Sequence, residues 1–251
     1  MFTVWSRQRL TSHPLRMECG QRLLERLDGL RLTPQHILDL DSAPAAGARQ
    51  LAERFVNAQV TAMEAREAQL KWLKRERGWW PRRYAMHQGS LLTLAETAHQ
   101  FDLIHAPLVM PRHREVEQVL RTLRQALTPG GLLLISVLGP DTLNGQVGGG
   151  DAQRLGSALT RAGFLEPVLD TDWITVHHPD EADLAQCMGD MGVNANAHPA
   201  PETPCSLVWE VVQATAWAPE DGMPVRTDHG EEASMSIDRI SVRQRNDTLK
   251  Y

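Results

Sequence analysis

The chain lacks any long apolar run. None of its segments approaches the roughly 18 consecutive apolar residues that are needed to cross a bilayer, and the first 20 residues lack the continuous apolar core of a secretory signal. We therefore expect a cytoplasmic protein without a membrane partner. With 251 residues, of which 42% are hydrophobic, the chain is long enough to bury a sizeable core.

The chain also has few cysteines and no net positive charge. Cys19, Cys187 and Cys205 are odd in number and widely spaced, which favours buried reduced thiols over a disulfide framework or a metal site. The formal net charge of −5 argues against nucleic acid as a general partner.

One stretch, residues 36–64, predicts a nucleotide-binding unit. Its apolar run from Ile37 to Leu40 is typical of a buried parallel strand, residues 48–55 favour a crossover helix, and Val60 to Met63 predict a second strand that ends at the acidic Glu64. Such a right-handed unit leaves a crevice at the carboxyl ends of its strands, where a nucleotide-like ligand can lie.

The turn inside this unit is poor in glycine. A loop that cradles a nucleoside usually contains several glycines, but this turn carries Asp41, Ala43 and Ala45, and its only glycine is Gly47. Where such a loop needs a positive φ angle, a Cβ atom costs about 1 kcal/mol or blocks the ligand. The carboxylate of Asp41 would also repel a negatively charged group of the ligand, unless a positively charged group of the ligand lies nearer to it.

The rest of the chain alternates between predicted helices and strands. A helix from Met17 leads into the first unit, and after it we expect helices at 65–77, 115–127, 154–162 and 180–188 and strands at 84–88, 101–110, 132–138, 173–177 and 207–217. The last two strands are predicted to close one sheet edge as an antiparallel pair. We therefore expect an arm at 1–16, an α/β domain at 17–219 and a polar tail at 220–251, disordered or with a short strand near 237–242.

Three segments, LTPGGLLLISVLGPDTL, RAGFLEPVLDTD and WEVVQATAWAP, resemble class I S-adenosylmethionine-dependent methyltransferases. Within that class they are most similar to the malonyl-acyl-carrier-protein O-methyltransferases of biotin synthesis. The resemblance implies a Rossmann-like, mostly parallel α/β sheet with an antiparallel last strand and helices on both faces. It also implies S-adenosylmethionine as cofactor and a carboxyl group on a carrier-bound acyl chain as methyl acceptor.

The resemblance places six residues at the cofactor, namely Asp39, Asp41, Ala43, Ala45, Glu64 and Ser90. Glu64 would accept hydrogen bonds from the ribose hydroxyls, and the alternative is a solvated carboxylate that caps the next helix. Asp39 is expected to orient the turn through backbone amides rather than to touch the ligand. Ser90 stands where the family often has an acid that meets the adenine amino group.

Two functions remain open at this level. An active enzyme would work mainly by placing a carboxylate in line with the methyl group in a dry cleft, so the sequence indicates no catalytic side chain. Alternatively, the altered turn, Ser90 and a short connection after GPDTL indicate an inactive module that has lost the cofactor. His87, His105 and His113 lack metal-ligand spacing, and we expect structural or surface roles for them.

A basic segment between Lys71 and Arg83 contains three tryptophans as well. It is a candidate dock for an acidic acyl carrier protein, because opposite charges steer such partners together. The alternatives are a solvated helix end with partly packed tryptophans and, less strongly, a surface on which bases stack. The cations of the dock would be Lys71, Lys74, Arg75, Arg77, Arg82 and Arg83.

Overall fold

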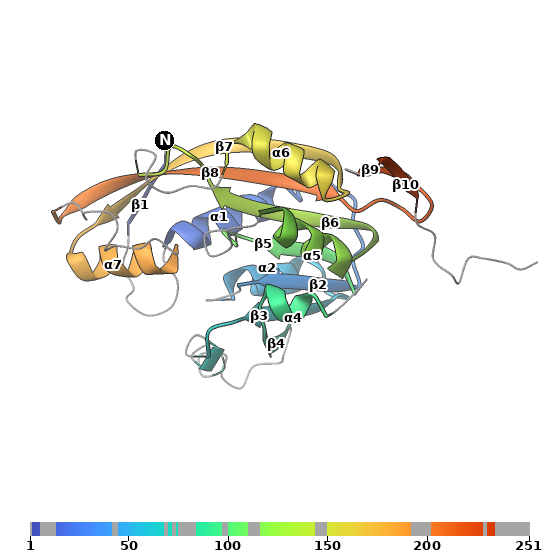
Figure 1. Ribbon diagram of the computed structural model, residues 1–251. Helices are drawn as coiled ribbons and strands as arrows, with labels where there is room; N and C mark the ends of the chain where they lie inside the picture. The colour runs from blue at the N-terminus through green and yellow to red at the C-terminus, as the bar shows by residue number, and fades with distance from the viewer. Residues whose placement is uncertain are drawn as a thin grey trace, which may run out of the picture.

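The computed structural model describes residues 2–5, 14–41, 45–67, 70–71, 74, 84–96, 100–109, 116–143, 150–191, 202–227 and 230–233. Helices and strands alternate along these residues (Figure 1). In chain order they are β1 (Phe2–Trp5), α1 (Pro14–Glu25), β2 (His36–Leu40), α2 (Ala46–Arg54), β3 (Gln59–Glu64), β4 (Tyr84–Gln88), α4 (Leu91–Leu94), β5 (Phe101–Ala106), α5 (Val116–Ala126), β6 (Leu127–Leu138), α6 (Ala152–Arg161), β7 (Leu165–His178), α7 (Glu181–Asp190), β8 (Cys205–Trp217), β9 (Pro224–Thr227) and β10 (Gly230–Ala233).

The main sheet has eight strands in the order β1-β7-β8-β6-β5-β2-β3-β4. All neighbouring pairs are parallel except β6–β8 and β7–β8, so β8 is the one strand that runs against the others. The predicted class I methyltransferase sheet, mostly parallel with an antiparallel last strand, is therefore confirmed. The strand order reverses between β2 and β5, and a ligand of such a sheet binds at the carboxyl ends beside this switch.

Helices cover both faces of the sheet, as predicted. One face packs against α4, α5 and α6, and its core includes Ile104, Leu133 and Leu159. The opposite face packs against α1 and α2 around Ile37 and Leu134. The two faces alternate along each buried strand because successive side chains point to opposite sides.

The strands β7 and β8 extend beyond the carboxyl end of β6. Leu138, the last residue of β6, pairs with Val211, so the part of β8 from Cys205 to Glu210 pairs with β7 alone. The helix α7 lies under this extension (Figure 1). A third apolar cluster, which includes Cys19 of α1, Met188 of α7 and Trp209, fills the space between them.

The helix α1 is anchored to this part of the sheet by Arg22. Its guanidinium lies 2.7 Å from the Asp172 carboxylate on β7 and 2.9 Å from Glu18. Burial opposes the charged form of Arg22, but the hydrogen bonds to Asp172 and Glu18 outweigh it and raise its pKa. Gln213 of β8 donates to the same Asp172 carboxylate at 3.1 Å.

Some boundaries differ from the sequence-based expectation. The arm expected at 1–16 contains β1, which pairs with β7, and the first residues of α1. The TPGG segment, expected as a turn before a strand at 132, is part of β6, because Leu127 already pairs with Phe101. The expected polar tail begins with the antiparallel pair of β9 and β10, and its expected strand near 237–242 lies outside the described residues.

Candidate functional site

The first strand of the nucleotide-binding unit carries a buried acid, Asp39. One carboxylate oxygen accepts a hydrogen bond of 2.8 Å from the N–H of Ala48, in the first turn of α2. The residue at the N-cap, Ala45, has no side chain that could do this. Asp39 therefore supplies the cap of α2 from the neighbouring strand, in line with the structural role expected for it.

The other oxygen of Asp39 lies 2.6 Å from Nδ1 of His105, on β5. Nε2 of the same ring lies 3.1 Å from the carbonyl oxygen of Gly20, on α1. Because a carbonyl only accepts, Nε2 is the donor toward Gly20, and Nδ1 faces the Asp39 carboxylate. This buried chain of contacts joins β2, β5 and α1, which is the structural role predicted for His105. His87 is exposed, and His113 lies outside the described residues.

Two residues of the turn after β2 have the left-handed backbone that glycine adopts freely, although neither is glycine. Asp41 has φ 53° and Ala45 has φ 62°, both in the left-handed region, while Ala43 lies outside the described residues. A non-glycine residue in this region costs on the order of 1 kcal/mol or more. The chain thus accepts backbone strain at two of the three substituted positions.

Arg16 of α1 reaches into the same region. Its guanidinium donates to the carbonyl oxygens of Pro107, at 2.6 Å, and Leu108, at 3.2 Å, where the chain leaves β5. It also lies 3.9 Å from the Asp41 carboxylate. Arg16 is 4% exposed, so this cation is held inside the protein at the carboxyl edge of the sheet.

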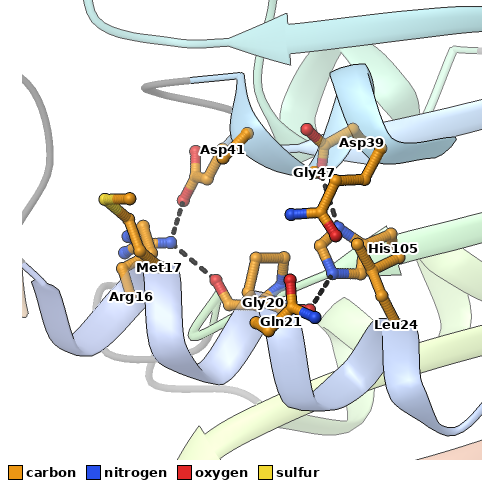
Figure 2. Close-up of a pocket in the computed structure, with 12 residues that line it drawn as sticks. Arg16, Met17, Gly20, Gln21, Leu24, Asp39, Asp41, Gly47 and His105 are labelled. Carbon is orange, nitrogen blue, oxygen red and sulfur yellow. Dashed lines mark hydrogen bonds and ion pairs between the residues drawn. The ribbon is translucent and has the colours of Figure 1, made fainter. Parts of the chain in front are cut away.

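A small pocket lies between α1, the turn after β2 and the end of β5 (Figure 2). Its volume is ≈ 30 Å³, which holds about two water molecules at 10–15 Å³ each. Met17 and Gln21, which line it from α1, are exposed and unbranched and can rotate away. Besides these two, the lining residues are Arg16, Gly20, Leu24, Asp39, Asp41, Ala46, Gly47, Gln50, His105 and Pro107.

Glu64 ends β3 with a fully buried carboxylate. Arg66 binds it through its backbone N–H at 2.9 Å, through Nε at 2.8 Å and through one terminal nitrogen at 3.3 Å. Arg66 is 25% exposed, so its side chain lies between this acid and the solvent. The structure thus holds an oriented acid at the end of the second strand, where the sequence predicted it.

Ser90 follows β4 and begins the short helix α4. Its hydroxyl accepts from the N–H of Leu92, and its own N–H bonds to the hydroxyl of Thr93, so the two side chains form a capping box. This pattern gives Ser90 a local role in starting the helix. Gly89, beside it, lies against Met63 of β3.

The cysteines show no reactive thiol. All three are free, and Cys19 and Cys187 are buried. Burial raises the pKa of Cys19 to about 12, so its thiol stays protonated at neutral pH. Within the described ranges, no group of three metal-ligating side chains exists, and no helix is long and apolar enough to span a membrane.

Sequence reasoning missed Arg16. Its position depends on the packing of α1 against a loop 91 residues further along the chain, and arginine is common in amphipathic helices, so no sequence signal distinguished it. Of the predicted basic dock, only Lys71 and Lys74 are described, and Lys71 pairs with Glu67 at 2.7 Å. Arg75, Arg77, Arg82 and Arg83 lie outside the described residues.

Comparison with known proteins identifies the family. A family model described as "Methyltransferase domain" matches residues 37–131. The malonyl-acyl-carrier-protein O-methyltransferase of Xylella fastidiosa is 32% identical over 94% of this chain and 92% of its own length. The chain belongs to the malonyl-acyl-carrier-protein O-methyltransferase family. A second member, from Gallionella capsiferriformans, is 29% identical over 72% of this chain and 68% of its own length.

The fold of this O-methyltransferase family member agrees with solved structures. The YcgJ protein of Bacillus aligns with a TM-score of 0.58 and 11% identity, over 80% of this chain and 98% of its own. Phosphoethanolamine N-methyltransferase 2 of Haemonchus contortus, solved with S-adenosyl-L-methionine, aligns with a TM-score of 0.56 and 16% identity. It aligns over 80% of this chain, which spans 52% of that longer protein. The predicted resemblance to S-adenosylmethionine-dependent methyltransferases is thereby confirmed.

Proposed function

We propose that this protein uses S-adenosylmethionine to methylate a carboxyl group of an acyl chain carried by an acyl carrier protein. The observation that carries the proposal is the turn after β2, which keeps left-handed backbone at Asp41 and Ala45 although both glycines are replaced. A chain under no need to keep this loop would be expected to relax the strain. The alternative, a binding module that has lost the cofactor, gains no support from the family relatives.

Two groups of residues support a cofactor with a ribose and an amino-acid part. Glu64 offers carboxylate oxygens at the end of β3, where ribose hydroxyls would donate to them, with Arg66 swinging toward solvent. The methionine part would lie beside Asp41, in the pocket lined by Met17 and Gln21, whose exposed side chains can rotate to make room for it. When bound, the cofactor supplies an activated methyl group on a sulfonium.

The chain's own residues have little acid–base chemistry to perform. A carboxylate acceptor is already the nucleophile at neutral pH, so catalysis consists of holding it in line with the methyl group and excluding water. The strand extension of β7 and β8, with α7 beneath it, overhangs the carboxyl edge of the sheet and would form one wall of that space.

Calorimetry with S-adenosylmethionine tests the cofactor. We expect saturable binding to the full chain, and we expect Glu64→Gln to weaken it by about tenfold or more, since hydrogen bonds to charged groups contribute ~1.5–3 kcal/mol. The matched control is Glu53→Gln, which changes an exposed glutamate on α2 and should leave affinity unchanged. Absence of heat at millimolar cofactor would contradict the proposal.

The acyl carrier protein is proposed as partner because the relatives' names state a carrier-protein substrate. Lys71 and Lys74 are exposed, as a steering surface requires. We expect the double change to glutamate at both positions to weaken capture of an acidic acyl carrier protein several-fold at low salt. The control changes Arg31 and Arg49, which are also exposed but lie outside the basic segment, to glutamate. Equal capture by both double variants would remove this role.

A further inference from the structure

The Asp41 carboxylate has no hydrogen-bond donor among the described residues. Only 15% of its side chain is exposed, and it lines the pocket beside the turn. No described residue donates a hydrogen bond to it, and it forms an ion pair with Arg16 at 3.9 Å. Charge-assisted hydrogen bonds are about 2.7–2.9 Å long, so this ion pair does not provide one.

Arg16 cannot simply close onto Asp41. Its guanidinium is held by the carbonyl oxygens of Pro107 and Leu108, and the backbone of Asp41 is held at φ 53°. A largely buried carboxylate without a donor needs an explanation, and strained backbone positions cluster at ligand sites.

The second acid of the pocket is already fully used. Both oxygens of Asp39 have partners, one in the N–H of Ala48 and the other in His105. Of the carboxylates that line the pocket, Asp41 is therefore the one without a hydrogen-bond donor among the described residues. A ligand group that matches it carries positive charge and several N–H donors.

We propose that Asp41 binds the α-ammonium group of the amino-acid part of S-adenosylmethionine. This inference rests on the proposed function and adds a residue that recognises one end of the cofactor. An ammonium has three donors and no acceptor, which suits a carboxylate that lacks donors. Asp41 in place of glycine is then a binding residue, not a defect of the turn.

Arg16 offsets the repulsion between Asp41 and the carboxylate of the cofactor. The cofactor's own carboxylate lies one carbon from its ammonium, so Asp41 alone would repel it. The Arg16 guanidinium, 3.9 Å from Asp41, places a positive charge at the same end of the pocket. The pair offers one charge of each sign, and a zwitterionic amino acid presents the complementary two.

Two nucleoside ligands distinguish recognition of the ammonium group from recognition of the rest of the cofactor. S-adenosylhomocysteine carries the amino-acid group, whereas 5′-methylthioadenosine shares the thioether nucleoside but lacks the ammonium and carboxylate. We expect Asp41→Asn to weaken the binding of S-adenosylhomocysteine by about tenfold, or ~1.4 kcal/mol. Calorimetry on the full chain measures this affinity. The affinity for 5′-methylthioadenosine should stay unchanged.

The control is Glu64→Gln, which removes the charge of the proposed acceptor for the ribose hydroxyls. It should weaken the binding of both ligands. Asp41→Gly provides a second variant that takes a positive φ angle freely and should show the same selective loss as Asp41→Asn. If the parent chain binds neither ligand, the proposed function fails. If the parent chain binds both ligands and the Asp41 variants keep the same affinities, or lose equal affinity for both, the ammonium role is overturned. The proposed function then still stands.

Discussion

Gly47→Ala is expected to lower the free energy of unfolding by about 2–3 kcal/mol, as overpacking of a tight site does. A Cβ atom at position 47 would lie 2.8 Å from the Asp39 carboxylate and 2.8 Å from the imidazole of His105. Neither group can swing aside, because both are buried and hydrogen-bonded to each other, to α2 and to α1. Urea unfolding followed by circular dichroism measures the loss.

The matched control for this change is Gly20→Ala. Gly20 approaches the same imidazole from α1, but a Cβ atom there would lie 3.5 Å from the ring, an ordinary contact. Alanine also favours the helix by about 1 kcal/mol over glycine. We expect this variant to be as stable as the parent or more so. A Gly47→Ala chain that unfolds at the same urea concentration as the parent would show that the buried pair can move.

Asp39→Ala is expected to lower the free energy of unfolding by about 3–5 kcal/mol, the range for removing one partner of a buried charged pair. The change leaves the N–H of Ala48 and Nδ1 of His105 without their partner and removes the cap of α2. Equilibrium unfolding in urea at neutral pH gives this value.

Asp39→Asn should cost much less, about 1 kcal/mol, because every hydrogen bond can be remade. The amide oxygen accepts from Ala48, the amide nitrogen donates to Nδ1, and Nε2 keeps its proton toward Gly20. The comparison therefore separates hydrogen bonding from charge. Equal losses for the alanine and asparagine variants would mean that charge alone holds the three elements together.

The fold was largely predictable because its strands carry strong local patterns. The strand at Tyr84–Gln88 is found at its predicted bounds, and Ile37 to Leu40 lie within β2. The parallel order then placed Asp39 and Glu64 at one edge without any knowledge of packing, since carboxyl ends of parallel strands meet there. The four-residue β1 was missed because a polar arm surrounds it and its pairing with β7 is entirely long-range.

The site itself was less predictable. The sequence showed that glycines were missing from the turn, but only the structure shows that Asp41 and Ala45 keep a left-handed backbone without them. From the sequence alone, the negative charge of Asp41 is expected to repel the carboxylate of the cofactor, because the position of Arg16 is not known. This neighbour of Asp41 comes from α1, 25 residues earlier in the chain, and tertiary packing alone brings the two together.

The pairing of β1 with β7 bears on how molecules of this protein meet one another. β1 lies at the end of the sheet and covers the backbone of β7 only from Ile174 to His177. Removing the first five residues would bare that stretch of a 14-residue strand. Unpaired strand edges can recruit strands of other chains, so we expect a chain without its first five residues to associate more readily with other copies of itself.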